Sequence, residues 1–216
     1  IKFLGNLKFS ESKTQKNITL NKNIEKIFKS RKIWCAASTH NGEEKICAEA
    51  HQKLKKKYKK LLTVIIPRHV HRVNDIYKEI LDMGFKVQIH SKKSKIKKDT
   101  DIYLVDTYGE TKSFFKICNT VFLGGSIVNH GGQNPLEPAR FGCKILHGPN
   151  IQNFTEVYRL LNKENLSFKF YNTNQLAKSV NQSLNQNMNF SKKIAKLKKI
   201  GSNILHHTSA EINYFL

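Results

Sequence analysis

The sequence has few acidic residues, few cysteines and no long apolar segment. Aspartate and glutamate number 16 among 216 residues, against 38 lysines and arginines, so the formal net charge is +22. The four cysteines form no CxxC pair and stand mostly among apolar neighbours, which favours buried, reduced thiols over a zinc site or disulfides. No apolar run approaches the roughly 20 residues that a transmembrane helix requires. No signal peptide is visible, although an anchor could lie upstream of Ile1.

Arginine is scarce as well, with five residues in a chain that uses lysine almost everywhere. A strong positive field favours anionic partners, namely nucleic acid, phosphorylated substrates or anionic lipid head groups. Nucleic-acid-binding modules usually gather arginines and aromatic residues where bases are read, and no such group stands out here. We therefore attribute most of the lysine excess to codon bias, and we expect an anionic membrane surface, and no nucleic acid, as a partner. A basic nucleic-acid-binding module is the alternative from a different functional class.

Short apolar runs indicate buried strands, separated by segments whose apolar residues have helical spacing. One helical stripe consists of Ile46, Ala50, Leu54 and Tyr58, and the next of Val73, Ile76, Ile80 and Met83. The predicted strands cover residues 33–37, 61–66, 86–89, 102–105, 121–123 and 144–146. This alternation predicts an α/β fold with a mostly parallel sheet of about six strands and helices on both faces. Polar residues from Tyr171 onward predict two or three further helices.

The loops that follow the strands are the candidate sites, because ligands of parallel sheets bind at the carboxyl ends of the strands. Ser38, Thr39 and His40 end the first strand, and the capping of a following helix does not explain all three. Asn41 and Glu44 have the spacing of a capping box, and the helix start would present free N–H groups to an anion.

After the second strand, Arg68 and His69 stand at the rim, with Arg72 one helical turn further on. In a lysine-rich chain, this choice of arginine favours planar, bidentate contact with a phosphate or a carboxylate. His71 is interpreted as a surface residue.

After the fourth strand, Thr107 and Glu110 again have the spacing of a capping box, so Glu110 is interpreted as structural. Gly109 between them could let a ligand come close.

The stretch "GGSIVNHGGQNPLEPARFG", residues 124–142, is rich in glycine and proline. Gly124, Gly125 and Ser126 follow a strand, where their backbone N–H groups can hold a phosphate or a carboxylate. Glycine suits such a loop because the backbone must approach a ligand closely and adopt positive φ.

A helix start follows in the same stretch. Asn134 is suited to the N-cap, Pro135 to the first position and Glu137 to the third. Glu137 either closes this capping box or binds the hydroxyls of a ribose, and we favour the ribose.

Six motifs occur in order along the chain: "GNLKF", "AASTHNGEE", "PRHVHR", "DTYGE", "FLGGSIVNHGGQNPLEPARFG" and "GPNIQNFTE". With them the chain resembles the C-terminal half of the bacterial Kdo transferases, which add 3-deoxy-D-manno-octulosonic acid to lipid A precursor. The resemblance implies a GT-B glycosyltransferase with two Rossmann-like domains, of which the C-terminal one binds the donor CMP-Kdo. It also implies inversion of configuration, no metal and no cofactor.

The resemblance implies roles for the residues of these motifs. The residues expected around CMP-Kdo are Ser38, Thr39, His40, Arg68, His69, Gly124, Gly125, Ser126, Asn134 and Glu137. Arg68 is expected at the phosphate or the sugar carboxylate, and Glu137 at the ribose. A second group consists of Gly109, Gln133, Asn153 and Glu156. The chain departs from the family pattern at Ser10, Thr111 and Gln133, where Asp, Leu and His are usual. The amide of Gln133 can replace an imidazole as a hydrogen-bond partner.

The resemblance also implies a division of the chain. Residues 1–20 are expected to be an interdomain segment, 21–190 the Rossmann-like nucleotide-sugar-binding domain, and 191–216 a helix on its flank or on an N-terminal domain. Because "GNLKF" follows so soon after a start without Met, we expect an upstream part of a longer protein.

The family's catalytic base and acceptor surface belong to that N-terminal domain, so no catalytic residue is assigned, and this chain alone is expected to be inactive. The implied function is transfer of Kdo from CMP-Kdo to lipid A precursor (lipid IVA) at the cytoplasmic face of the bacterial inner membrane. The nearest alternative is another GT-B enzyme that uses a UDP- or ADP-sugar.

Overall fold

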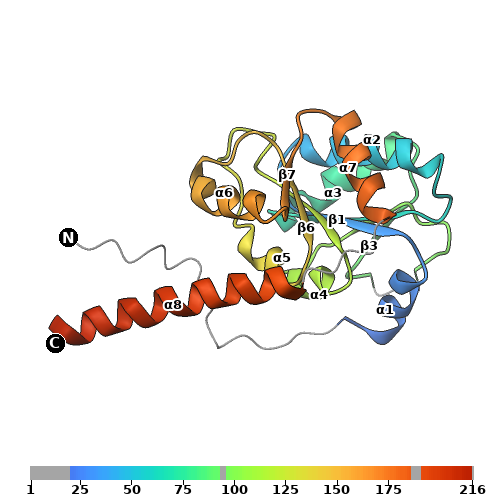
Figure 1. Cartoon of the computed structure of the whole chain (residues 1–216). Coiled ribbons are helices and arrows are strands. Elements are labelled where there is room, and N and C mark those ends of the chain that lie inside the picture. The colour runs from blue at the N-terminus through green and yellow to red at the C-terminus, as the bar shows by residue number, and fades with distance from the viewer. Residues whose placement is uncertain (1–19, 93–95, 186–190, 216) are drawn as a thin grey trace.

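The fold is built on one sheet, which the computed structural model shows together with its helices for residues 20–92, 96–185 and 191–215. Seven strands pair in the order β3-β4-β2-β1-β5-β6-β7, and every neighbouring pair is parallel (Figure 1). The strands are β1 (Ile33–Thr39), β2 (Leu62–Pro67), β3 (Val87–Ile89), β4 (Ile102–Leu104), β5 (Thr120–Leu123), β6 (Lys144–His147) and β7 (Ser167–Lys169). The predicted parallel sheet is confirmed. Edge strand β7 was missed because its sequence, Ser-Phe-Lys, contains a single apolar residue.

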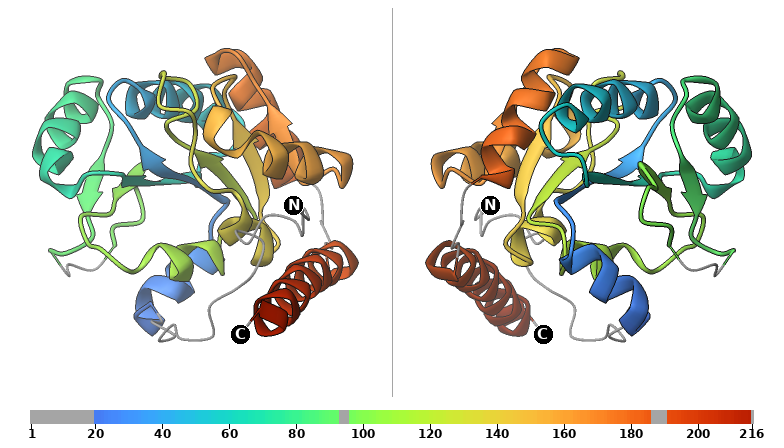
Figure 2. Two further views of the ribbon diagram at one scale, coloured as in Figure 1. Left: turned by 90° about the vertical axis from the view of Figure 1, so that its left-hand side faces the viewer. Right: turned by 90° about the vertical axis from the view of Figure 1, so that its right-hand side faces the viewer.

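Helices cover both faces of the sheet, as predicted (Figure 2). Helices α2, α3 and α7 lie on one face, and α1, α4 and α5 lie on the other, with α8 beyond them. Their bounds are α1 (Lys22–Lys29), α2 (Glu43–Lys55), α3 (Val73–Asp82), α4 (Thr111–Phe115), α5 (Leu136–Arg140), α6 (Thr155–Lys163), α7 (Thr173–Leu184) and α8 (Ser191–Phe215).

Residues of β1 alternate between the two apolar cores, as the period of a strand requires. Trp34 and Ala36 pack on the α2 face, while Cys35 and Ala37 pack on the α1 face. All four cysteines are buried and unbridged, which confirms the interpretation as reduced thiols.

The strand order reverses beside β1. From β1 the chain first builds β2, β3 and β4 on one side, and then crosses to build β5, β6 and β7 on the other. The loops after β1 and β5 therefore leave adjacent strands in opposite directions. At such a topological switch point a crevice opens at the carboxyl ends of the strands, which is where ligands bind in open α/β sheets.

Two of the predicted capping boxes are wrong. Helix α2 has Gly42 as its N-cap, with φ of 86°, and no side chain caps it, so Asn41 does not have the predicted role. Helix α4 has Glu110 itself at the N-cap, three residues later than expected. In both loops the acidic residue bonds to a distant part of the chain, as described below.

Two helices follow Tyr171, within the predicted number, namely α7 and α8. The first half of α8 lies against α5, with Leu197 buried and Lys196 Nζ 2.5 Å from Glu164 Oε1. Its second half extends past the sheet (Figure 1). In the described part of the chain, no helix is both long and apolar enough to span a bilayer. The "GNLKF" motif and Ser10 lie outside the described residues, and the predicted division into three segments stays a prediction.

Phe28 anchors α1 to the sheet, and its removal is expected to destabilise the protein. The side chain is fully buried and packs edge-on against Tyr103 at 5.4 Å between ring centroids. Phe28→Ala should therefore lower the free energy of unfolding by about 3–5 kcal/mol, because it leaves a cavity. Urea unfolding measures this change. Tyr108→Ala, at a side chain that is 71% exposed, is the control and should change stability by less than about 0.5 kcal/mol. Equal effects of the two changes would contradict the packing of α1.

Candidate functional site

The loops after β1, β2 and β5 meet at the crevice where the strand order reverses. The N–H of Arg68 donates to the carbonyl of Thr39 at 3.0 Å, and the N–H of Gly124 donates to the carbonyl of Ala37 at 2.9 Å. A Cβ on Gly125 would lie 3.1 Å from Cε1 of His40. The structure therefore brings together the three predicted groups, 38–40, 68–69 and 124–126.

The backbone of the first loop is strained at Ser38. This residue has φ of 55°, a left-handed conformation that side chains other than glycine rarely adopt, and the β1–β2 register shifts between Ala37 and Thr39. The strain costs on the order of 1–3 kcal/mol and is typical of functional sites. The turn points the Ser38 carbonyl at the ring of His40, whose Nδ1 lies 3.1 Å away.

Four imidazole rings gather at this edge of the sheet, and we call them the histidine cluster: His40, His69, His71 and His130. The rings of His40 and His130 stack with centroids 4.3 Å apart, and His69 lies 6.1 Å from His40. His130 was not predicted as a site residue, although it stands between the two glycine pairs of the motif. His71 was interpreted as a surface residue and is indeed exposed, with its ring 5.6 Å from His69.

Burial lowers the pKa of His40 to about 4, and the neighbouring His130 acts in the same direction. His40 is therefore neutral at pH 7 and serves the site as a packed, hydrogen-bonding ring.

Glu43 has a central place in the site that the sequence did not predict. Its carboxylate is fully buried and accepts backbone hydrogen bonds from Gly125 at 2.8 Å, Ser126 at 3.2 Å and Ile127 at 3.0 Å. A fourth bond comes from the N–H of His40 at 2.9 Å. The N–H groups of the glycine-rich turn were predicted to hold a phosphate or carboxylate of a ligand. That prediction is wrong for Gly125 and Ser126, because the carboxylate they hold belongs to this chain.

Glu44, the next residue, is also fully buried and fixes the first loop to the turn that precedes α3. Arg72 contacts both of its oxygens, with Nη1 3.0 Å from Oε1 and Nη2 3.3 Å from Oε2. The hydroxyl of Thr39 donates to Oε1 at 2.9 Å. Arg72 thus makes the planar, bidentate contact expected of it, and the carboxylate is internal.

Position 124 requires glycine because the surrounding atoms are closely packed. A Cβ there would lie 2.3 Å from the carbonyl oxygen of Ser38 and 2.6 Å from Oε2 of Glu43, so a side chain has no room. Gly148 is similar, because its Cβ would lie 2.2 Å from the carbonyl oxygen of Ser126. Positive φ was correctly expected for Gly125, at 66°, but the close approach is to the protein's own backbone.

The predicted donor-binding residues fall into two sets by exposure. Fully or largely buried residues form the foundation of the crevice: Thr39, His40, Gly124, Gly125 and Ser126. The hydroxyl of Ser126 donates to the carbonyl of Leu123 at 2.6 Å and accepts from the N–H of Gly148. Exposed or partly exposed residues form the rim: Ser38, Arg68, His69, Asn134 and Glu137. Side chains of the rim are the ones that a ligand can reach, and their predicted contacts stay predictions.

At the start of α5 the N-cap is Pro135, one residue later than the predicted cap, Asn134. Oδ1 of Asn134 accepts from the N–H of Leu136 at 3.0 Å. Glu137 lies 3.3 Å from Nζ of Lys112 on α4, and its side chain is 41% exposed. A ligand can therefore compete with Lys112 for this carboxylate.

Two residues of the second predicted group, Gln133 and Asn153, make hydrogen bonds that support the loop after β5. Nδ2 of Asn153 donates to the carbonyl of His130 at 3.0 Å, and the carbonyl of Gln133 accepts from the hydroxyl of Tyr158. Gly109 has φ of 83°, and Glu156 is exposed on α6. Thr111, a departure from the family pattern, is the first residue of α4.

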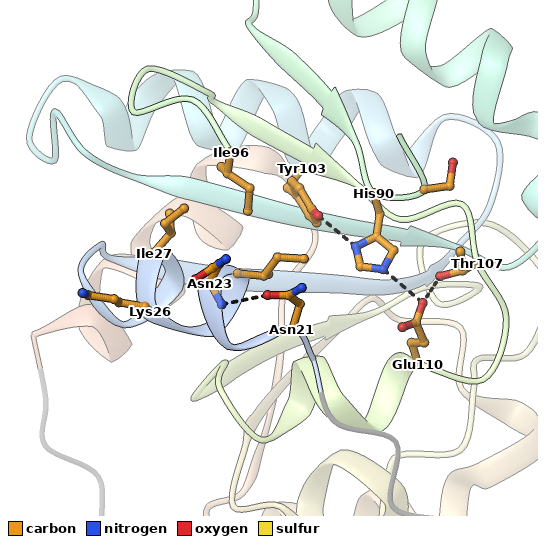
Figure 3. A pocket seen from close by; sticks show the side chains of 11 residues that line it. Asn21, Asn23, Lys26, Ile27, His90, Ile96, Tyr103, Thr107 and Glu110 are labelled. Carbon is orange, nitrogen blue, oxygen red and sulfur yellow. Dashed lines mark hydrogen bonds and ion pairs between the residues drawn. The ribbon is translucent and has the colours of Figure 1, made fainter. Parts of the chain in front are cut away.

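A separate recess of about 770 Å³ opens between α1 and the ends of β3 and β4 (Figure 3). One wall is a polar network in which His90 bonds to the hydroxyl of Tyr103 at 2.8 Å and to Glu110 at 3.0 Å, and Thr107 also bonds to Glu110. Ile27 and Ile96 line the opposite side (Figure 3). The partner of Glu110 is thus His90, directly after β3, which explains why the predicted capping box did not form.

In the described parts of the chain, no group of three or more histidine, cysteine or acidic side chains is arranged to hold a metal ion.

Comparison with known proteins identifies relatives of this sequence, although no protein-family model matches it. The chain is 35% identical to the 3-deoxy-D-manno-octulosonic acid transferase of Haemophilus influenzae over 158 residues, which are 73% of this chain and 37% of that protein. It is 30% identical to the enzyme of the same name from Aquifex aeolicus over 149 residues, 69% of this chain and 41% of that protein. The chain belongs to the 3-deoxy-D-manno-octulosonic acid (Kdo) transferase family. It spans about two fifths of the length of these relatives.

A solved structure has the same fold. The C-terminal CMP-Kdo-binding domain of WaaA from Acinetobacter baumannii superposes with a TM-score of 0.69 at 24% identity, covering 82% of this chain and 91% of that domain. The predicted fold class, a Rossmann-like domain of the GT-B type, is confirmed by this match and by the seven-stranded parallel sheet.

Buried neutral histidines make the stability of this chain sensitive to acid. Burial lowers the pKa of both His40 and His147 to about 4. Between about pH 6.5 and 4, the unfolded chain therefore binds protons that the folded chain does not, so stability is full above that range and falls as the pH falls. Urea unfolding at pH 7.5 and 5.0 should differ by about 2 kcal/mol for each histidine. His40→Gln should reduce the difference, whereas the exposed His206→Gln should not. Equal stability of the wild type at both pH values would contradict the burial of these rings.

Proposed function

We propose that this chain is the donor-binding half of an inverting GT-B glycosyltransferase that transfers Kdo from CMP-Kdo to lipid A precursor (lipid IVA). The observation that carries the proposal is the convergence of the loops after β1, β2 and β5 at the switch point of the sheet. These loops contain three of the motifs through which the chain resembles Kdo transferases. The proposed setting is lipopolysaccharide synthesis at the cytoplasmic face of the bacterial inner membrane, where the net charge of +22 would favour an anionic surface.

The donor carries two kinds of anion, a phosphate and a sugar carboxylate, and the rim offers the groups that bind them. Since Glu43 occupies the N–H groups of the glycine-rich turn, a side-chain cation has to serve instead. Arg68 is exposed beside the crevice, and its guanidinium can contact either anion with two parallel hydrogen bonds. His69 stands beside it as a second donor.

Glu137 is proposed to bind the two ribose hydroxyls. Its carboxylate is partly exposed and lies on the first turn of α5, next to the glycine-rich loop. In the absence of ribose, Lys112 neutralises it. Binding would exchange an exposed ion pair, which contributes little to stability, for two charge-assisted hydrogen bonds.

The catalytic base and the acceptor surface are proposed to belong to an N-terminal domain of the Kdo transferase type. The chain alone should therefore bind the donor without transferring Kdo. The proposal includes no metal or cofactor, as the resemblance implies.

Selective binding of CMP is the expected result that tests the function. Calorimetric titration of the 216-residue chain should show affinity for CMP at least tenfold above that for UMP, because hydrogen bonds of a base pocket reject the wrong base strongly. Preference for UMP would favour the rival enzyme that uses another nucleotide sugar. Binding of duplex DNA with a steep salt dependence, and no nucleotide affinity, would favour a nucleic-acid-binding module.

Arg68→Ala should weaken CMP-Kdo binding and leave the fold intact. The loss of one charge-assisted contact is expected to cost about 1.5–3 kcal/mol of binding free energy. Lys78→Ala, at an exposed position on α3, removes the same charge away from the crevice and should leave affinity unchanged. Unchanged affinity in a folded Arg68→Ala protein would refute the assignment. An equal loss of affinity in both variants would show that net charge, and not the position of Arg68, determines binding.

A further inference from the structure

The carboxylate of Glu43 connects the two walls of the crevice. Oε2 accepts from His40, which belongs to the loop after β1, and from Gly125, which belongs to the loop after β5, at 2.9 and 2.8 Å. Oε1 accepts from Ser126 and Ile127, at 3.2 and 3.0 Å. The partners in the second loop lie 82 to 84 residues further along the chain.

This arrangement inverts the usual use of such a turn. Successive backbone N–H groups that converge on one point form an anion site, and in ligand-binding loops the anion comes from the ligand. Here a buried side chain supplies it. A fully buried carboxylate is costly unless it is hydrogen-bonded, and four N–H groups from two loops satisfy this one.

Helix capping does not explain Glu43. It is the first residue of α2, where a negative charge is favourable, but a capping role would turn its oxygens towards the N–H groups of its own helix. The neighbouring Glu44 provides a comparison within the same turn. It is equally buried, and its partners are the side chains of Arg72 and Thr39, with none in the loop after β5.

We propose that Glu43 is the positioning residue of the donor site, and that its carboxylate fixes the glycine-rich turn against the loop after β1. The inference rests on the proposed function, since the site that Glu43 organises is the proposed CMP-Kdo site. Glu43 does not touch the donor. It acts through Gly125, Ser126 and Ile127, which hold His130 and the rest of this loop in register with His40.

The geometry distinguishes a carboxylate from its amide. Glu43→Gln keeps the volume, so the protein should fold, but the amide NH2 group must face N–H donors that already point at it. Glu43→Ala removes the anion and leaves a space, which formate, a free carboxylate, can enter. The matched control is Glu44→Gln, which neutralises the adjacent buried carboxylate without touching the turn.

Hydrogen exchange of backbone amides, followed by NMR on the 216-residue chain, tests the anchoring without any donor. In Glu43→Gln and Glu43→Ala, the amides of Gly125 and Ile127 should exchange at least tenfold faster relative to those of β1, whereas Glu44→Gln should leave this ratio unchanged. Formate should restore protection in Glu43→Ala and have no effect in Glu43→Gln. Unchanged ratios in folded Glu43→Gln, or the same change in Glu44→Gln, would overturn the proposal.

The affinity for CMP, measured on the same samples, tests positioning as opposed to mere stability. It should fall at least tenfold in both Glu43 variants at a temperature where they are folded, and recover with formate in Glu43→Ala. A loosened turn with undiminished CMP affinity would overturn the positioning role. If the wild type binds no CMP, the proposed function fails, and the exchange ratios alone then decide whether Glu43 anchors the turn.

Discussion

Two buried carboxylates at the start of α2 hold the carboxyl edge of the sheet together. Glu43 bonds to the turn after β5, and Glu44 bonds to Arg72 beyond β2, so both loops next to β1 are fixed to the same helix start. The free energy of two buried charges is unfavourable by itself, and it is offset only when every oxygen is satisfied. The crevice at the switch point therefore depends on both loops being in place at once. Its walls are set before a ligand arrives.

Different residues set the shape of the crevice and recognise a ligand. The buried residues under the crevice, such as Thr39 and Ser126, bond to one another and to the backbone, so their contribution is the position of the loops. Recognition is left to the exposed side chains of the rim. Because Glu43 occupies the N–H groups of the turn after β5, the two anionic groups of the proposed donor need the cations of that rim, and Arg68 stands there in a chain that uses lysine almost everywhere.

Local sequence patterns predicted the sheet well, because apolar runs mark buried parallel strands wherever they occur. Edge strand β7 has no such run and was missed. The patterns were less successful at the loops. The spacing of a capping box at residues 107–110 is the same whether the glutamate bonds to its own helix or to His90, which follows another strand. Likewise, a glycine-rich turn indicates an anion site, but the sequence does not show whether the anion belongs to a ligand or to the protein itself. Glu43 could not be paired with Gly125 from the sequence, since 82 residues separate them.

The contact between Gly148 and Ser126 connects the end of β6 to the crevice. Gly148 follows that strand and leaves no space for a side chain above the Ser126 carbonyl, and its own N–H bonds to the Ser126 hydroxyl. The loops after β1, β5 and β6, three neighbouring strands of the sheet, are thus in direct contact, with no space left between them. A side chain at position 148 would therefore have to displace Ser126 and the turn after β5, so a residue outside the rim would change the shape of the crevice.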